Sequence, residues 1–387
     1  MSNKKITILI PCLNEEKMIG DVIKDCWIGL NNDKINNQVL IVDSGTDQSG
    51  EIAKSLGADV LKTPKRGLGR AYIDSIPHIK GDYVVMGDAD RTYDFKETPN
   101  FTKKLDEGYE FVMGTRTKGW IEKGARPPLH RYFGAPITNW IFNLVYGSNF
   151  SDIHCGLRAM TKDALVRMNL KSQSWQYASE MIIKSIQMNF KRTEVPIRFY
   201  RDRYGRVPHL RQGWLTPWKA GWISLQMMFT HRADFFLYRP GIVFTFLGLI
   251  IVASLSFGPF YIFSIHFMLL GMTLAVLGTV SIFMGIVARA IYDLSGKKIK
   301  KYLKMFQYNK SFLLSLVLSL IGILFTFPLV GDFISFGYRL PSGIQDKYYL
   351  SVTGLTLILI AFINFTFSLL LHALSERLEE KTQIIKN

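Results

Sequence analysis

The chain has 387 residues, a hydrophobic fraction of 48% and a formal net charge of +16. This length allows more than one domain, and three cysteines without a CxxC pair exclude a disulfide framework or a cysteine zinc site. The basic residues are dispersed and no nucleic-acid-reading module is visible, so no nucleic acid partner is expected. The charge fits cytoplasm-facing loops of a membrane protein, or attraction to anionic lipids and phosphorylated ligands.

The first 115 residues alternate short apolar strands with helical stretches. Alternation of this kind predicts a mostly parallel, Rossmann-like α/β sheet that binds ligands at the carboxyl ends of its strands. The apolar stretch 6–10 is too short for a signal peptide, so this half is expected to stay in the cytoplasm. The predicted strands are 6–10, 39–42, 58–61, 83–87 and 110–114, and the predicted helices lie near 15–29, 49–56, 68–77 and 97–107.

Three of these predicted strands run directly into polar segments. The segments are 11–16, 43–47 and 88–90, and a glycine-containing basic segment, 65–71, lies between the last two. A single aspartate that closes an apolar strand is common and can simply cap a turn. Three such segments in succession indicate a ligand site at one edge of the sheet.

Asp88 and Asp90 are two residues apart at the end of the fourth predicted strand. In extended backbone this spacing places both side chains on one face. Carboxylates are the hard oxygen ligands that suit Mg²⁺ or Mn²⁺, and such an ion can bridge phosphates. The pair therefore predicts a divalent metal site for a phosphorylated ligand.

The C-terminal part contains four apolar runs, each near the ~20 residues that a bilayer core requires. A lysine-rich connector, 297–310, predicts a cytoplasmic loop, so that both termini lie in the cytoplasm in a multi-pass protein. Asp and Glu are missing from the runs, which favours an anchoring or lipid-holding role over ion-coupled transport. The predicted spans are 241–257, 264–286, 312–330 and 350–372.

Trp214, Trp218 and Trp222 recur at intervals of four residues just before the first span. Within 212–235 they predict an amphipathic helix in the membrane interface; a helix packed on a soluble core is the alternative. Residues 132–147 are a second candidate for such a helix. The predicted domains are thus 1–208, catalytic, 209–235, interfacial, and 236–387, transmembrane.

The motifs Ile-Pro-Cys-Leu-Asn-Glu-Glu, Ile-Val-Asp-Ser-Gly-Thr-Asp and Asp-Ala-Asp make residues 4–208 resemble glycosyltransferase family 2, with its GT-A fold. Within that family the chain is most similar to polyprenyl-phosphate glycosyltransferases, including dolichyl-phosphate mannose synthases. The resemblance implies inverting transfer of one hexose from a nucleotide diphosphate sugar, of the GDP-mannose or UDP-glucose type, to a dolichyl or undecaprenyl phosphate. The Gln-x-x-Arg-Trp motif of processive polysaccharide synthases is missing, which favours transfer of one sugar per turnover over synthesis of a polymer.

The resemblance also implies roles for individual residues. Asp88 and Asp90 would hold the metal, although Thr92 stands where a related pattern has a glutamine ligand. The region around Asp152 resembles a loop near the donor sugar. Together with Asp88 and Asp90, the expected nucleotide-sugar contacts are Pro11, Asn14, Glu15, Asp43, Arg66, Ala89, Asp152, Glu180, Arg201 and Arg203.

Arg116 and Arg131 match arginines that bind the acceptor phosphate in the resembling synthases. A phosphate monoester, with a second pKa of about 6, is largely ionised at neutral pH and needs no strong general base. It needs cations that hold it in line with the anomeric carbon of the donor sugar, and the planar guanidinium of arginine suits phosphate. The alternative interpretation is a pair of exposed, solubilising arginines.

Two other functions stay open at this point. Transfer to a lipid hydroxyl, such as that of diacylglycerol or a ceramide, would require a base, for which Glu180 is the candidate. A non-catalytic flippase or scaffold for lipid-linked sugars is the other. The donor sugar, the isoprenoid length and the oligomeric state are not predicted.

Overall fold

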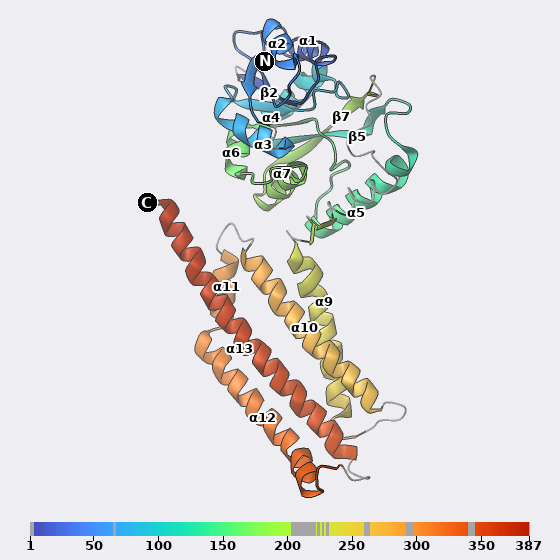
Figure 1. The fold of residues 1–387 in the computed structure, drawn as a ribbon, viewed down its shortest axis with the longest axis vertical. Helices are drawn as coiled ribbons and strands as arrows, with labels where there is room; N and C mark the ends of the chain where they lie inside the picture. Colours follow the sequence, from blue (N-terminus) through green and yellow to red (C-terminus); the bar gives the residue numbers. More distant parts are fainter. Residues whose placement is uncertain are drawn as a thin grey trace. The chain divides into compact units, whose positions relative to one another are not determined.

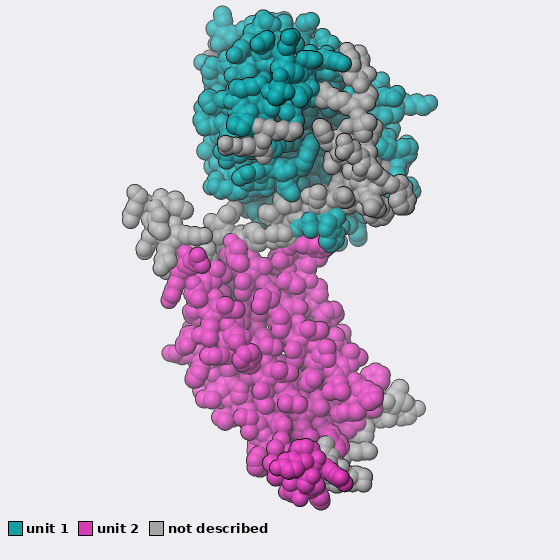
Figure 2. All heavy atoms as spheres, viewed as in Figure 1, with its two compact units in different colours: residues 1–228 teal, residues 229–387 magenta. Residues whose placement is uncertain are grey.

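A computed structural model of the chain describes residues 4–64, 67–202, 232–258, 264–291, 297–339 and 345–386, together with residues 222, 225, 226, 228 and 229. The chain divides into two compact units, residues 1–228 and 229–387, which are coloured separately in Figure 2. Each unit has its own core, and each is considered by itself below.

The first unit is built on a seven-stranded mixed sheet (Figure 1). Its strand order is β3-β2-β1-β4-β6-β5-β7, and β6 runs antiparallel to both of its neighbours while the other pairs are parallel. The strands are β1 (Ile6–Cys12), β2 (Gln38–Asp43), β3 (Asp59–Lys62), β4 (Tyr83–Met86), β5 (Phe111–Ile121), β6 (Arg158–Thr161) and β7 (Arg192–Phe199).

Helices cover the sheet because each carries an apolar stripe. In α1, for example, Ile19, Val22, Ile23 and Cys26 recur at helical spacing and are buried. The helices of this unit are α1 (Ile19–Gly29), α2 (Ser49–Ser55), α3 (Leu68–Ser75), α4 (Thr98–Asp106), α5 (Ala135–Tyr146), α6 (Lys162–Met168) and α7 (Gln176–Gln187), with the short turns η1 (Ile76–His78), η2 (Phe95–Glu97) and η3 (His130–Gly134).

The five predicted strands and four predicted helices of the first 115 residues are confirmed, although most of their ends are shifted and β5 continues to Ile121, well beyond the predicted end at residue 114. One detail was wrong: β4 ends at Met86, and Ala89 and Asp90 lie in a turn, so the two aspartates do not share one stretch of extended strand. Arg91, in the left-handed region with a φ of 59°, continues that turn. The carboxyl ends of β1, β2 and β4 nevertheless meet at one edge of the sheet, as predicted, because the three strands are parallel.

The second unit consists of α9 (Ala233–Leu255), α10 (Ile265–Ile291), α11 (Lys297–Met305), α12 (Tyr308–Ser335) and α13 (Gln345–Lys386). Four of these, all but α11, are long and apolar enough to cross a membrane, and each overlaps one of the four predicted spans. Glycines let α9 and α10 approach closely: a Cβ on Gly248 would lie 2.3 Å from the Ala275 nitrogen. Between α12 and α13, the Asn364 amide donates to the Ser311 carbonyl and to Ser315 Oγ.

The predicted interface helix 212–235 falls mostly outside the described residues, as do Trp214 and Trp218. The second candidate, 132–147, is helical: it corresponds to the end of η3 and to α5. Pro136 lies in the first turn of α5, and Gly147 ends it with a φ of 63°. Its location in a membrane interface stays a prediction.

Candidate active site

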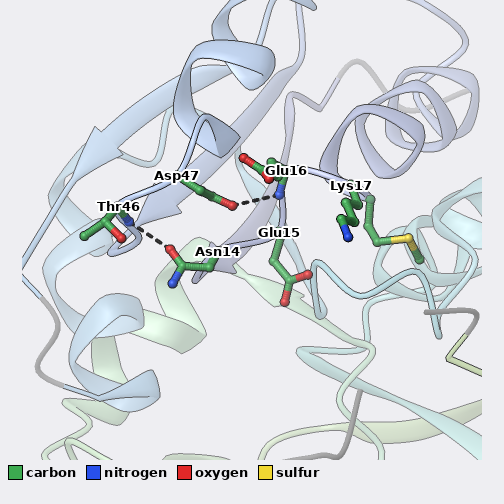
Figure 3. A pocket seen from close by; sticks show the side chains of 7 residues that line it. Asn14, Glu15, Glu16, Lys17, Thr46 and Asp47 are labelled. Carbon is green, nitrogen blue, oxygen red and sulfur yellow. Dashed lines mark hydrogen bonds between the residues drawn. The ribbon is translucent and has the colours of Figure 1, made fainter. Parts of the chain in front are cut away.

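A pocket of about 410 Å³ lies where the loops after β1 and β2 meet (Figure 3). Asn14, with a φ of 58°, turns its side chain to the second loop, and its Oδ1 accepts a hydrogen bond from the Thr46 amide at 2.8 Å. The Glu16 amide donates to Asp47 Oδ2 at 3.0 Å. The two loops therefore form one wall. The lining residues are Asn14, Glu15, Glu16, Lys17, Met18, Thr46 and Asp47.

Asp43 is the last residue of β2, directly before the loop that lines this pocket, and it is buried. Its carboxylate accepts hydrogen bonds from the Gly45 amide and from Lys62 Nζ, both at 2.8 Å. Pro11 lies in β1, next to Val42 in the register, and the Glu15 amide donates to Ser49 Oγ at 2.8 Å. The structure thus brings together four of the predicted nucleotide contacts: Pro11, Asn14, Glu15 and Asp43.

Asp88 and Asp90 are partly buried in the turn after β4. Burial, and next the charge of Asp90, raise the pKa of Asp88, while the guanidinium groups of Arg158 and Arg116 oppose that rise. Burial also raises the pKa of Asp90. The negative charge of Asp90 disfavours ionisation of Asp88, and a cation bound between the two carboxylates would relieve that repulsion.

Thr92 contacts the second of these carboxylates directly. Its amide and its hydroxyl donate to Asp90 Oδ1 at 3.0 and 2.6 Å. Both bonds favour the ionised carboxylate and fix its orientation. Thr92 therefore orients a candidate metal ligand, while Ala89 between the two aspartates is buried.

Arg116 and Asp152 form a buried ion pair. Arg116 Nε and Nη2 donate to the two oxygens of Asp152 at 2.6 and 2.9 Å, and the Arg116 amide also donates to Oδ2. Burial alone would raise the pKa of Asp152, but the hydrogen bonds from Arg116 lower it to about 2. Asp152 has an exposed fraction of 0% and Arg116 of 6%. The aspartate therefore positions the arginine, and a direct contact of Asp152 with a sugar stays a prediction.

Glu180 is also held within the protein. Its carboxylate accepts hydrogen bonds from the Lys171 and Ser172 amides and forms an ion pair with Lys184 Nζ at 2.8 Å. Although burial raises its pKa, these bonds lower it overall. The loop that it holds packs against α3, since a Cβ on Gly69 would lie 2.1 Å from the Ser172 carbonyl oxygen. Glu180 thus anchors a loop.

Among the described residues, no contact links the other predicted arginines to Arg116. Arg131, in η3, lies 5.4 Å from the centre of the Tyr132 ring. The Arg201 amide donates to Glu122 Oε2, and its side chain is exposed. Arg66 and Arg203 lie outside the described residues.

Two residues at this edge were missed by the sequence analysis. Arg158, in β6, is buried beside Asp88, and its guanidinium donates to the Cys155 and Ala178 carbonyls at 2.8 and 2.6 Å. Tyr93 accepts a hydrogen bond from the Gly156 amide at 2.7 Å. A Cβ on Gly156 would lie 3.0 Å from Asp88 Oδ2 and from the Tyr93 hydroxyl. For Arg158, the sequence signal was its place at the start of a short apolar stretch, which is β6 in the structure.

The curated relatives of this chain include proteins of Haloferax volcanii. The low-salt glycan biosynthesis hexosyltransferase Agl6 is 33% identical over 246 residues, which are 63% of this chain and 58% of that protein. This chain therefore spans less than two thirds of Agl6. A dolichyl-phosphate hexose transferase is 28% identical over 207 residues, which are 52% of this chain and 85% of that protein.

Among solved structures, glucosyl-3-phosphoglycerate synthase from Mycobacterium tuberculosis, in complex with Mn²⁺, UDP and glucosyl-3-phosphoglycerate, is similar to this chain. The TM-score is 0.46 at 20% identity, over 58% of this chain and 80% of that one. The family model described as glycosyl transferase family 2 matches residues 7–168, from β1 to the end of α6, which contain the pocket, the Asp88–Asp90 pair and the Arg116–Asp152 pair. The chain therefore belongs to glycosyl transferase family 2, through a GT-A-like α/β domain that is followed by four long apolar helices.

Proposed function

We propose that the protein is a metal-dependent, inverting glycosyltransferase that moves one hexose from a nucleotide diphosphate sugar to a polyprenyl phosphate. The observation that carries the proposal is the Asp88–Asp90 pair at the carboxyl edge of the sheet, with the buried guanidinium groups of Arg116 and Arg158 beside it. The name of the similar dolichyl-phosphate hexose transferase supports the same acceptor class.

The donor set at Asp88 and Asp90 fits Mg²⁺ or Mn²⁺, because both ligands are hard carboxylate oxygens whose repulsion a cation relieves. Within the described ranges, no group of three His, Cys, Asp or Glu residues is suited to hold a metal ion. Two carboxylates are nevertheless sufficient for an ion that takes its other ligands from water and from the diphosphate. Such an ion, when bound, neutralises charge on the departing diphosphate as a Lewis acid.

The protein's own residues bind and orient the two substrates. In the proposal, Asn14, Glu15 and Asp43 hold the nucleotide at the pocket, and the hydrogen bonds from Thr92 orient Asp90 and favour its ionised form. Arg116 and Arg131 hold the acceptor phosphate. Asp152 occupies the Nε–Nη2 edge of Arg116, so this arginine would approach the phosphate through Nη1. Because the phosphate is already ionised, no protein base is required.

Placement of the catalytic domain in the cytoplasm is part of the proposal. The segment between α10 and α12 carries Lys297, Lys298, Lys300, Lys301 and Lys304. An excess of lysine in a short loop favours its cytoplasmic location. With four crossings, both termini would lie on that same side.

A transfer assay with the purified, full-length protein tests the proposal. Radiolabelled GDP-mannose, UDP-glucose and UDP-N-acetylglucosamine are each incubated with polyprenyl phosphate and Mg²⁺ or Mn²⁺, and lipid-linked label is extracted into organic solvent. We expect label in the organic phase with one donor, and its loss when a chelator replaces the metal. No lipid-linked label with any of these donors would contradict the proposed function.

Substitution of Glu180 separates this function from transfer to a lipid hydroxyl. Its carboxylate is saturated by backbone amides and Lys184, so it is unsuited to act as a base. We expect Glu180→Gln to keep turnover within about tenfold of wild type and to lower stability by about 1–3 kcal/mol through the disturbed loop contacts, as measured by initial rates and thermal unfolding. The exposed Glu51→Gln is the control. Abolished turnover with unchanged stability would instead indicate a hydroxyl acceptor.

A further inference from the structure

Arg91, which directly follows the candidate metal ligand Asp90, has an unusual backbone conformation. Its φ of 59° lies in the left-handed region, where side chains other than those of asparagine, aspartate and histidine are uncommon. A backbone conformation of this kind persists only where the surrounding structure enforces it, and it often marks a functional site. The contacts of the Arg91 side chain show what enforces it here.

The guanidinium of Arg91 binds two carboxylates of helix α1. Its Nη1 lies 2.5 Å from Asp21 Oδ2, and its Nε lies 3.6 Å from Asp25 Oδ2. The two aspartates are four residues apart, so they lie on one face of the helix. The side chain of Asp25 is only 14% exposed and that of Arg91 30%, so salt screens this contact less than one between fully exposed charges. The turn after β4 is thus attached to α1.

Helix α1 also contacts the segment that follows this turn. One helical turn after the second aspartate, a Cβ on Gly29 would lie 2.1 Å from the Phe95 carbonyl oxygen, so the two backbones are in close contact. The buried Phe95 ring packs against Gly87, the residue before Asp88, where a Cβ would lie 2.7 Å from the ring. Residues on both sides of the aspartate pair are therefore supported from α1: Gly87 through the Phe95 ring, and Arg91 through its ion pairs.

The other end of this connection is the nucleotide pocket, where α1 begins. Residues 15–18 line the pocket (Figure 3) and lead into the helix, and the Glu15 carbonyl accepts a hydrogen bond from the Ile19 amide at 2.9 Å. Asp21 lies in the first turn of α1. Because hydrogen-bonded helical turns have a fixed geometry, α1 and the Arg91 contact together set the distance between the pocket and the candidate metal ligands.

We propose that Arg91 is a positioning residue for the donor: it holds Asp90 at a fixed distance from the nucleotide pocket, so that one nucleotide diphosphate reaches the pocket and the metal together. Arg91 acts through Asp90 and Thr92, its neighbours in the turn, and needs no contact with a substrate. The value of this spacing for the donor rests on the proposed function. The attachment of the turn to α1 does not, so it is tested without turnover.

Asp21→Asn/Asp25→Asn tests the attachment, because it removes both carboxylates and leaves the sequence of the turn unchanged. The control is Lys96→Met, which removes a second cation that lies 3.5 Å from Asp25. The measurement is hydrogen exchange of the Thr92 amide, which donates to Asp90 Oδ1. We expect faster exchange in the double variant and wild-type exchange in the control. Equal exchange of this amide in the two variants would overturn the proposal.

Mn²⁺ affinity, measured by electron paramagnetic resonance with the metal alone, tests the effect on the candidate metal site. Arg91→Asn removes the guanidinium, and asparagine tolerates the left-handed region better than arginine, so backbone strain cannot explain a loss. We expect this variant and the double variant to bind Mn²⁺ about 10- to 100-fold more weakly, as is typical when groups that orient metal ligands are removed. Wild-type affinity in both variants would contradict the positioning role.

Two further measurements distinguish positioning from general damage to the fold. Arg91→Lys should recover part of the lost Mn²⁺ affinity, since an ammonium group can pair with one of the two carboxylates. Binding of UDP and GDP without metal should stay as in wild type, because none of the substituted residues lines the pocket. Equally weakened binding of metal and of nucleotide would show that the fold is disturbed and would overturn the specific role of Arg91.

Failure of this inference and failure of the proposed function give different results. If the wild-type protein binds no Mn²⁺ and transfers no sugar, the proposed function fails, whereas exchange of the Thr92 amide still decides whether Arg91 holds the turn. If Asp21→Asn/Asp25→Asn unfolds, Arg91→Asn and Arg91→Lys replace it. Faster Thr92 exchange is then expected in the asparagine variant than in the lysine variant, and equal exchange would contradict the inference.

Discussion

Replacing Asp90 with asparagine is expected to lower kcat/KM for sugar transfer by about 10³-fold, the magnitude associated with loss of a preorganised electrostatic group at the reacting centre. Asparagine keeps an Oδ1 that accepts the two hydrogen bonds from Thr92, so the turn after β4 should be retained. What the substitution removes is one of two negative charges that a divalent ion requires.

Two measurements check this expectation. Initial rates give the loss in transfer, and Mn²⁺ binding followed by electron paramagnetic resonance gives the loss in metal affinity. Asp163→Asn, which removes an exposed carboxylate on α6, serves as the control and should resemble wild type. Wild-type Mn²⁺ affinity and wild-type rates in Asp90→Asn would together contradict the metal site.

The substitution Asp152→Asn is expected to lower the free energy of unfolding of the first unit by about 3–5 kcal/mol, because it leaves the buried guanidinium of Arg116 without its counter-charge. Thermal or urea unfolding followed by tryptophan fluorescence measures the change. The pKa of Asp152, about 2 in the folded protein, lies below its ordinary value of 3.8. The stabilisation is therefore complete above pH 3.8 and is lost as the pH falls toward 2.

A double variant separates the ion pair from other effects at this position. Arg116→Met/Asp152→Asn removes the unpaired charge together with its partner, and we expect most of the lost stability to return. Transfer should stay low, since Arg116 is gone. If the double variant is as unstable as Asp152→Asn alone, charge burial is not the cause of the destabilisation.

The first half of the sheet was predictable because its sequence signals are local. Strands such as Gln38–Asp43 are buried along their whole length and read as continuous apolar runs that end in polar residues. The four long apolar helices were predictable for the same reason, since length and hydropathy suffice. The polar motifs at the ends of these strands then led to the family resemblance, and the resemblance implied the roles of the site residues.

What the sequence could not provide is the pairing between distant residues. β6 has four residues and begins with Arg158, whose burial depends on carbonyls of Cys155 and Ala178. The engagement of Arg116 by Asp152, 36 residues away, has no periodic signature. Glu180 was a candidate base because the sequence does not show that the backbone amides of Lys171 and Ser172 bind its carboxylate.

The antiparallel insertion of β6 between β4 and β5 has a consequence for the order of folding. Met86 pairs with Arg158, so the chain must reach residue 158 before the turn that carries Asp88 acquires its buried guanidinium neighbour. Contacts so distant in sequence form slowly. As the chain is synthesised, β1, β2 and β3 can therefore pair early. Until β6 is inserted, Asp88 and Asp90 repel each other without the guanidinium of Arg158 to offset their charge. Completion of the catalytic edge is thus a late event in the biogenesis of the domain.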